Sequence, residues 1–221
     1  SNYWYNDGLR KAKIRDISGA VQSLKRSLQY NRENIPARNL LGLVYYERGE
    51  IAEAIVEWIL SQNFQKSDNL AGYFIREIQK DKKTLEEIDR AVQMYNQCLV
   101  YCDQGAEDLA VIQLKKAVQI HPSYLKAYQL LALLYLKTGQ YQKAKQVLKR
   151  AHRLDTTNET TLKYMHELSE LRETQGTKGR EQKTYEIGND TVIQPAVSPL
   201  KENAGFLTIL NIVIGILLGA A

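Results

Sequence analysis

Residues 38–58, RNLLGLVYYERGEIAEAIVEW, decide the fold because their spacing recurs further along the chain. Residues 128–148, YQLLALLYLKTGQYQKAKQVL, follow the same order of residue types. A large residue is followed by leucine, a small residue and tyrosine, and an alanine and another large residue come after a short polar stretch. A recurring order of this kind indicates a repeated supersecondary unit. Each copy has room for two helices and one turn, so the sequence predicts stacked helical hairpins.

Two weaker copies lie 34 residues before the two strong ones, so that repeats start near residues 1, 35, 91 and 125. In each copy a small residue on the first helix allows the second helix to approach closely. An alanine on the second helix receives a bulky side chain in return. The small residues are Gly8, Gly42, Cys98 and Ala132, and the alanines are Ala20, Ala54, Ala110 and Ala144.

This pattern resembles the tetratricopeptide repeat (TPR), and the resemblance covers about 136 residues, or four units of 34. It implies an all-α solenoid of helical hairpins, with Gly49, Gly105 and Gly139 in the left-handed turns between helices. The composition agrees, because four prolines and three phenylalanines among many straight-chain residues favour helix over sheet. The overall plan is similar to that of single-span, membrane-anchored bacterial TPR proteins.

The repeats are expected in two pairs, at residues 1–68 and 91–158, separated by an inserted segment at 69–90. Leu70, Phe74 and Ile78 predict one helix in the insert, and a second apolar stripe from Leu85 predicts that the first helix of the third repeat is extended backwards. Residues 159–174 are predicted to form a capping helix over the last apolar face. Residues 175–203 are polar and contain glycines and prolines, as in a flexible linker.

The segment 204–221, AGFLTILNIVIGILLGAA, has no charged residue. At about 1.5 Å per residue a helix of this length spans roughly 27 Å, close to the thickness of a hydrocarbon core. We therefore expect a single-pass membrane protein whose repeats, with their two unpaired cysteines, lie in the cytosol. The alternative is a terminal helix buried against the repeats, but a run that is apolar on every face has no polar side for water.

No pattern in the sequence is typical of an enzyme or a metal site. His166-Glu167 begins like a zinc protease motif, but Glu170 stands where the second histidine is required. Cys98 and Cys102 are one helical turn apart without a second pair of ligands, so packing explains them better than metal binding. We expect no catalytic residue, no metal and no cofactor.

The resemblance implies binding of a protein or peptide partner in the groove formed by the first helices of the repeats. Tyr5 and Leu9 stand where chaperone-binding members carry a Lys and Asn clamp, so a mainly aromatic and aliphatic groove remains. The alternative is that the chain's own inserted helix fills this groove. The positions assigned to the groove are Tyr5, Leu9, Asn39, Leu43, Tyr46, Tyr95, Leu99, Cys102, Gln129, Leu133, Leu136 and Lys137.

The net charge of +5 is concentrated in the second half, where residues 111–163 contain ten Lys or Arg against Asp155 and Glu159. A second hypothesis is therefore an anion-binding module for acidic lipid or nucleic acid. A solvated helix face explains the same charges, and the absence of interleaved aromatic residues disfavours nucleic acid. Self-association stays open. The basic face is predicted to comprise Lys143, Lys145, Lys149, Arg150 and Arg153.

Overall fold

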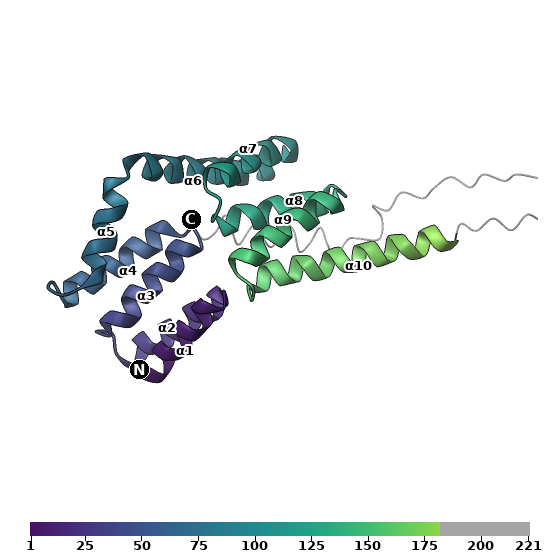
Figure 1. Ribbon diagram of the computed structural model, residues 1–221. Helices are drawn as coiled ribbons and strands as arrows, with labels where there is room; N and C mark the ends of the chain where they lie inside the picture. Colours follow the sequence, from purple (N-terminus) through teal and green to yellow (C-terminus); the bar gives the residue numbers. More distant parts are fainter. Residues whose placement is uncertain (182–221) are drawn as a thin grey trace, which may run out of the picture.

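The structure, a computed structural model, describes residues 1–181, with side chains to residue 173. This part of the chain contains ten α-helices and no strand, which confirms the predicted all-α class. Successive helices pair into hairpins (Figure 1). The helices are α1 (Asn2–Lys13), α2 (Ile17–Tyr30), α3 (Ile35–Glu47), α4 (Ile51–Phe64), α5 (Leu70–Lys80), α6 (Lys82–Asp103), α7 (Glu107–Ile120), α8 (Leu125–Lys137), α9 (Tyr141–Leu154) and α10 (Glu159–Glu181).

Four hairpins, α1–α2, α3–α4, α6–α7 and α8–α9, are the four repeats. In the first two, the predicted contact between a small and a bulky residue joins Gly8 to Leu24 and Gly42 to Trp58. A Cβ atom on Gly42 would lie 2.3 Å from Nε1 of Trp58, so only glycine lets α4 approach α3 this closely. The Trp58 indole donates a hydrogen bond of 3.1 Å to the Asn39 carbonyl, which satisfies its buried N–H. The four alanines of the pattern are fully buried.

The turns inside the hairpins use the left-handed backbone conformation. Gly49, Gly105 and Gly139 have φ of 80°, 72° and 70°, as the sequence predicts. The equivalent residue of the first repeat is Arg15, with φ of 63°. A left-handed conformation costs a residue with a Cβ about 1–2 kcal/mol, so other contacts of Arg15 must offset this cost.

The insert forms α5 and the first turns of α6, as the sequence predicts (Figure 1). Each helix has a side-chain cap: Asn69 accepts a hydrogen bond from the Ala71 N–H, and Asp81 accepts one from the Thr84 N–H. Helix α6 has 22 residues and continues from the insert into the third repeat, so it connects the two pairs of repeats.

Helix α10 packs on α8 and α9, with Tyr164 and Leu168 in the core, and so covers the last hairpin as predicted. It continues to Glu181, past the predicted start of the linker at residue 175. The rest of that linker and the segment 204–221 lie outside the described residues. None of the described helices is long and apolar enough to cross a bilayer.

Candidate functional site

An open apolar cavity of about 310 Å³ lies between the second repeat and the insert. We call it the insert pocket. Its wall contains two predicted groove residues, Leu43 and Tyr46, from α3, and it receives further apolar side chains from α4, α5 and α6. The complete lining is Leu43, Tyr46, Trp58, Tyr73, Phe74, Glu77, Ile78, Asp81, Thr84, Leu85 and Ile88.

Aromatic rings build the floor of the insert pocket. Trp58, held by its hydrogen bond to α3, packs in a tilted arrangement against Phe74, with 5.2 Å between ring centroids, and against Tyr46, with 6.3 Å. Tyr73 meets the edge of Phe74 at 5.8 Å. Tyr46 and Tyr73 remain 37% and 52% exposed, so their rings are available to a partner. A fixed floor with exposed aromatic residues is typical of a protein-binding site.

The rim of the insert pocket is acidic. Asp81 accepts hydrogen bonds from the Thr84 N–H at 3.0 Å and hydroxyl at 2.6 Å, and these bonds lower the pKa of its carboxyl. Glu77 accepts a bond of 2.6 Å from Lys80, an exposed lysine. The rim therefore presents an ionised carboxylate beside an apolar cavity.

The polar groove position Asn39 serves the insert instead of a partner. Its side chain is buried, donates to the Asn69 side chain at 2.9 Å and accepts from the Ser61 hydroxyl at 2.6 Å. Asn69 in turn caps α5. In the first repeat, Tyr5 and Leu9 are half-buried, and Tyr5 packs against the core of the first repeat pair.

The groove positions of the third and fourth repeats are not exposed. Tyr95 and Leu133 are only 5% and 2% exposed, and Leu99, Leu136 and Cys102 are also buried. The physical reason is the packing of α6, α7, α8 and α10 in one apolar cluster, which contains these five residues together with Tyr164 and Leu168 of the capping helix. Burial raises the pKa of Tyr95 to about 12. These five residues are core residues, which corrects their assignment to an open groove wall.

The two polar groove positions of α8 have partners inside the chain. Gln129 donates to the Asn158 side chain at 2.6 Å and to the Thr161 hydroxyl at 3.1 Å. Lys137 forms an ion pair with Glu107 of α7, which lowers the pKa of that carboxyl. Both residues hold neighbouring helices together, so of the predicted set only Leu43 and Tyr46 line the insert pocket.

The predicted basic face divides in two. Lys143 donates to Gln140 at 2.6 Å with its ammonium over the Tyr135 ring, and Lys145 is half-buried. Lys149, Arg150 and Arg153 are exposed on α9. Within residues 1–173, none of these last three side chains forms an ion pair with another residue.

The two cysteines are buried, free thiols in the core between α6 and α7. The Cys98 thiol donates to the Ala110 carbonyl at 3.4 Å. Burial raises the pKa of Cys98 to about 12 and that of Cys102 to about 11, so both are protonated and unreactive at neutral pH. In the described part of the chain, no group of His, Cys, Asp or Glu residues is placed to hold a metal ion.

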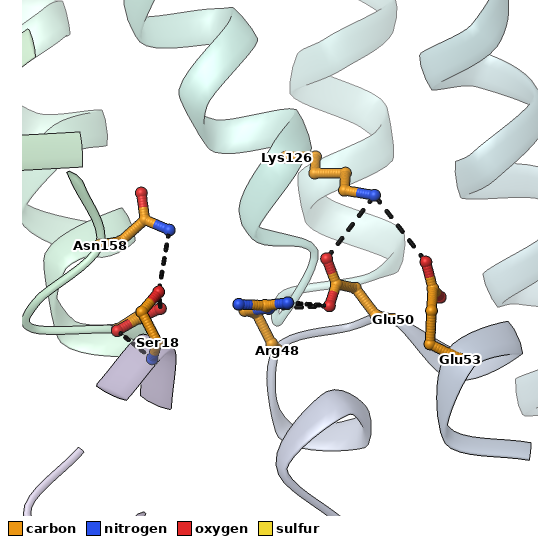
Figure 2. A network of polar contacts seen from close by, with 7 residues as sticks. Ser18, Arg48, Glu50, Glu53, Lys126 and Asn158 are labelled. Carbon is orange, nitrogen blue, oxygen red and sulfur yellow. Dashed lines mark hydrogen bonds and ion pairs between the residues drawn. The ribbon is translucent and has the colours of Figure 1, made fainter. Parts of the chain in front are cut away.

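Turns that are far apart in the sequence meet between the two pairs of repeats (Figure 2). The fully buried Asp155 carboxylate, in the α9–α10 turn, accepts hydrogen bonds from the Ser18 N–H at 3.1 Å and hydroxyl at 2.6 Å. In the second contact, Lys126 lies 3.6 Å from Glu50 and 3.9 Å from Glu53. We call these two contacts together the clasp.

Arg15 makes further contacts next to the Asp155–Ser18 part of the clasp, and these contacts explain its strained backbone. Its carbonyl accepts bonds of 3.0 Å from both the N–H and the hydroxyl of Thr156, and its side chain reaches the Arg153 carbonyl and, at 3.0 Å, Glu47. The sequence does not predict the clasp, whose residues are far apart along the chain. The only signal for it was an arginine at the position where three other repeats have glycine.

Comparison with known proteins supports the repeat assignment. Residues 103–159 match the model of a tetratricopeptide-repeat family. The chain is similar to a TPR repeat-containing protein of Methanocaldococcus jannaschii, with 26% identity over 172 residues, or 75% of this chain. The matched part of this chain covers only 24% of the length of that relative.

Two solved structures are also similar to the chain. The MamA protein is 24% identical, with 69% of this chain and 90% of that chain covered and a TM-score of 0.31. The TPR domain of P58(IPK) is 10% identical, with 81% and 67% covered and a TM-score of 0.37.

Proposed function

Because the chain is a tetratricopeptide-repeat protein, we propose that it is a membrane-tethered scaffold that binds a peptide or helix of a partner protein in the insert pocket. Proteins built from these repeats are generally interaction modules without enzymatic activity. The proposal extends this property to a particular surface of this chain.

The observation that carries the proposal is the exposed aromatic lining of the insert pocket. Its apolar wall is assembled from three helices around the fixed Trp58 ring, and Tyr46 and Tyr73 stay open to solvent at its mouth. An apolar concavity between helices suits the apolar face of a short helix or peptide. Desolvation of a few aromatic residues in such a concavity commonly supplies most of the binding free energy.

The acidic rim narrows the class of partner. Glu77 and Asp81 lie at the pocket edge, and the pKa of Asp81 is lowered by its hydrogen bonds to Thr84. A partner segment with a Lys or Arg next to its apolar residues therefore complements this rim, because opposite charges at an interface fix orientation and register.

Replacing Tyr73 by alanine is expected to weaken partner binding by about 30-fold, which corresponds to the roughly 2 kcal/mol of an aromatic hot spot. The fold should be unaffected, since the ring is half exposed. The measurement is titration of the partner, first identified by photo-crosslinking from an aromatic analogue at position 73. Tyr30→Ala is the matched control, because Tyr30 is 72% exposed and outside the pocket lining. Equal loss of binding in both variants, or crosslinking of the same partner from position 30, contradicts the proposed site.

The lack of catalytic chemistry is part of the proposal. Both cysteines are buried, and the pKa of each thiol is raised by burial, which makes the thiolate nucleophile scarce at neutral pH. These thiols contribute to packing in the core, and the functional surface of a scaffold is the pocket that a partner enters.

The membrane tether is the segment 204–221, whose 18 uncharged residues support insertion into a bilayer. We expect the full chain to float with neutral phosphatidylcholine vesicles and to stay with them at high salt, because apolar insertion is not screened by ions. Deletion after Asn203 should abolish flotation. If the full chain and the deleted chain sediment alike, the tether is absent and the scaffold acts in solution.

A further inference from the structure

The second helices of the four repeats share two neighbouring positions whose chemistry differs from repeat to repeat. In three repeats the two positions hold a pair of cations, and in the second repeat they hold two aliphatic residues. Because the positions are equivalent, each pair of side chains lies on the same side of its own hairpin. The pairs are Lys25–Arg26, Ile59–Leu60, Lys115–Lys116 and Lys149–Arg150.

The cation pairs of the third and fourth repeats are free for an external partner. In the first repeat, the Lys25 ammonium lies over the Tyr45 ring at 5.9 Å and the Arg26 guanidinium over the Trp4 ring at 4.8 Å. Their counterparts in α7 and α9 are all exposed, and so is Arg153 one turn later. No ion pair joins any of these five cations to another residue in the part of the chain with described side chains. We call Lys115, Lys116, Lys149, Arg150 and Arg153 the α7–α9 face.

A cavity of about 420 Å³ lies beside this face, with Arg150 in its lining. The first pair of repeats has an equivalent cavity, in which Arg38 and Glu57 form an ion pair of 2.8 Å. Ninety residues later the same positions are Tyr128 and Val147, so the second cavity has lost both charges. The lining of the second cavity is Val118, Gln119, Pro122, Tyr128, Leu131, Gln146, Val147 and Arg150.

Exposed apolar side chains adjoin the cations on α7. Leu109 and Ile112 are each 51% exposed, and Ile112 is one helical turn before Lys116. Cations and exposed aliphatic residues therefore occur on α7 and α9 beside a cavity whose only charged lining residue is Arg150. This combination is typical of a surface that lies on the headgroups of an acidic membrane, where lysine and arginine meet phosphate and aliphatic residues enter the acyl boundary.

We propose that the α7–α9 face binds the surface of an acidic phospholipid membrane. Nucleic acid is the less favoured partner, because α7 has no aromatic residue and both aromatic residues of α9, Tyr141 and His152, are half-buried. The inference rests on the proposed tether in one respect, since the segment 204–221 would keep this face close to a bilayer. The tether supplies attachment, and the face selects the lipid charge and orients the repeats.

A dye at position 146 tests the proposal in the full chain. Gln146 is exposed at the cavity, and the substitution Gln146→Cys can be labelled selectively because both native thiols are buried. With vesicles containing about one third phosphatidylserine, we expect a blue-shifted emission that neutral vesicles do not produce. Replacing the five cations of the α7–α9 face by Gln should raise the lipid concentration at half-maximal shift by at least tenfold. Each cation near an acidic surface increases the affinity for the membrane by about five-fold.

The matched control replaces three exposed lysines and two exposed arginines of the first repeat pair and the insert, which changes the net charge equally. Its emission shift should equal that of the unmodified face. Flotation with neutral vesicles reports on the tether separately, so the tether can fail while the acidic-lipid shift persists. Equal loss in the control set, or a shift caused by a DNA duplex with a steep salt dependence in place of acidic vesicles, overturns the proposal. The control residues are Lys66, Arg76, Lys82, Lys83 and Arg90.

Discussion

Replacing Trp58 by alanine is expected to lower the free energy of unfolding by about 3–5 kcal/mol, the range for a buried tryptophan. Trp58 is 1% exposed and fills the space above Gly42. Its removal leaves a cavity, breaks the hydrogen bond to the Asn39 carbonyl and removes the floor of the insert pocket. The measurement is urea unfolding followed by circular dichroism.

Trp4→Ala is the control for this prediction. Trp4 is half-buried on α1, and its ring is covered by the guanidinium of Arg26. Its loss removes an exposed cation–π contact worth about 0.5–1 kcal/mol together with part of its burial, so the destabilisation should be clearly smaller. Equal destabilisation by the two substitutions would mean that the packing of Trp58 against Gly42 is not a principal source of stability.

Leu133→Ala is expected to cost about 2–5 kcal/mol, as is usual for a buried leucine. Repeat phase alone places Leu133 on the wall of an open groove, where truncation should be harmless to the fold. In the structure it is 2% exposed, and it lies in one apolar cluster with Tyr95 and with Tyr164 of the capping helix. Thermal and urea unfolding of the same variant measure the difference.

Leu109→Ala provides the comparison, because Leu109 is 51% exposed in the same half of the molecule. Exposed positions usually change stability by no more than about 0.5 kcal/mol. If Leu133→Ala is as mild as Leu109→Ala and yet prevents partner binding, then α10 does not cover α8 in solution, and the groove of the second repeat pair is open.

The sequence predicted the hairpins because their determinants are local. The spacing of Gly42 and Trp58, the turn glycines and the helix-forming composition all act within one repeat, and the structure contains each of them in its expected place. The extended α6 was predictable for the same reason, since a continuous apolar stripe needs only its own helix period.

The candidate site was predicted only in part because burial depends on helices that are distant in the sequence. Leu43 and Leu133 occupy comparable positions on first helices, yet Leu43 lines the insert pocket and Leu133 is covered. What differs is the neighbour: α5 leaves a cavity beside α3, whereas α10 packs closely on α8. Repeat phase gives the direction of a side chain but not the identity of the helix opposite it.

The clasp changes how the chain is expected to unfold. In an open solenoid each repeat contacts only its neighbours, so unfolding can begin at either end and proceed inwards. Here the first hairpin is bonded to the turn before α10, through Ser18 and Asp155, residues 137 positions apart. Fraying of either end must break this contact, so the first and last repeats belong to one cooperative unit. The same closure raises the contact order, and the joining of the two ends is a late, entropically costly step of folding.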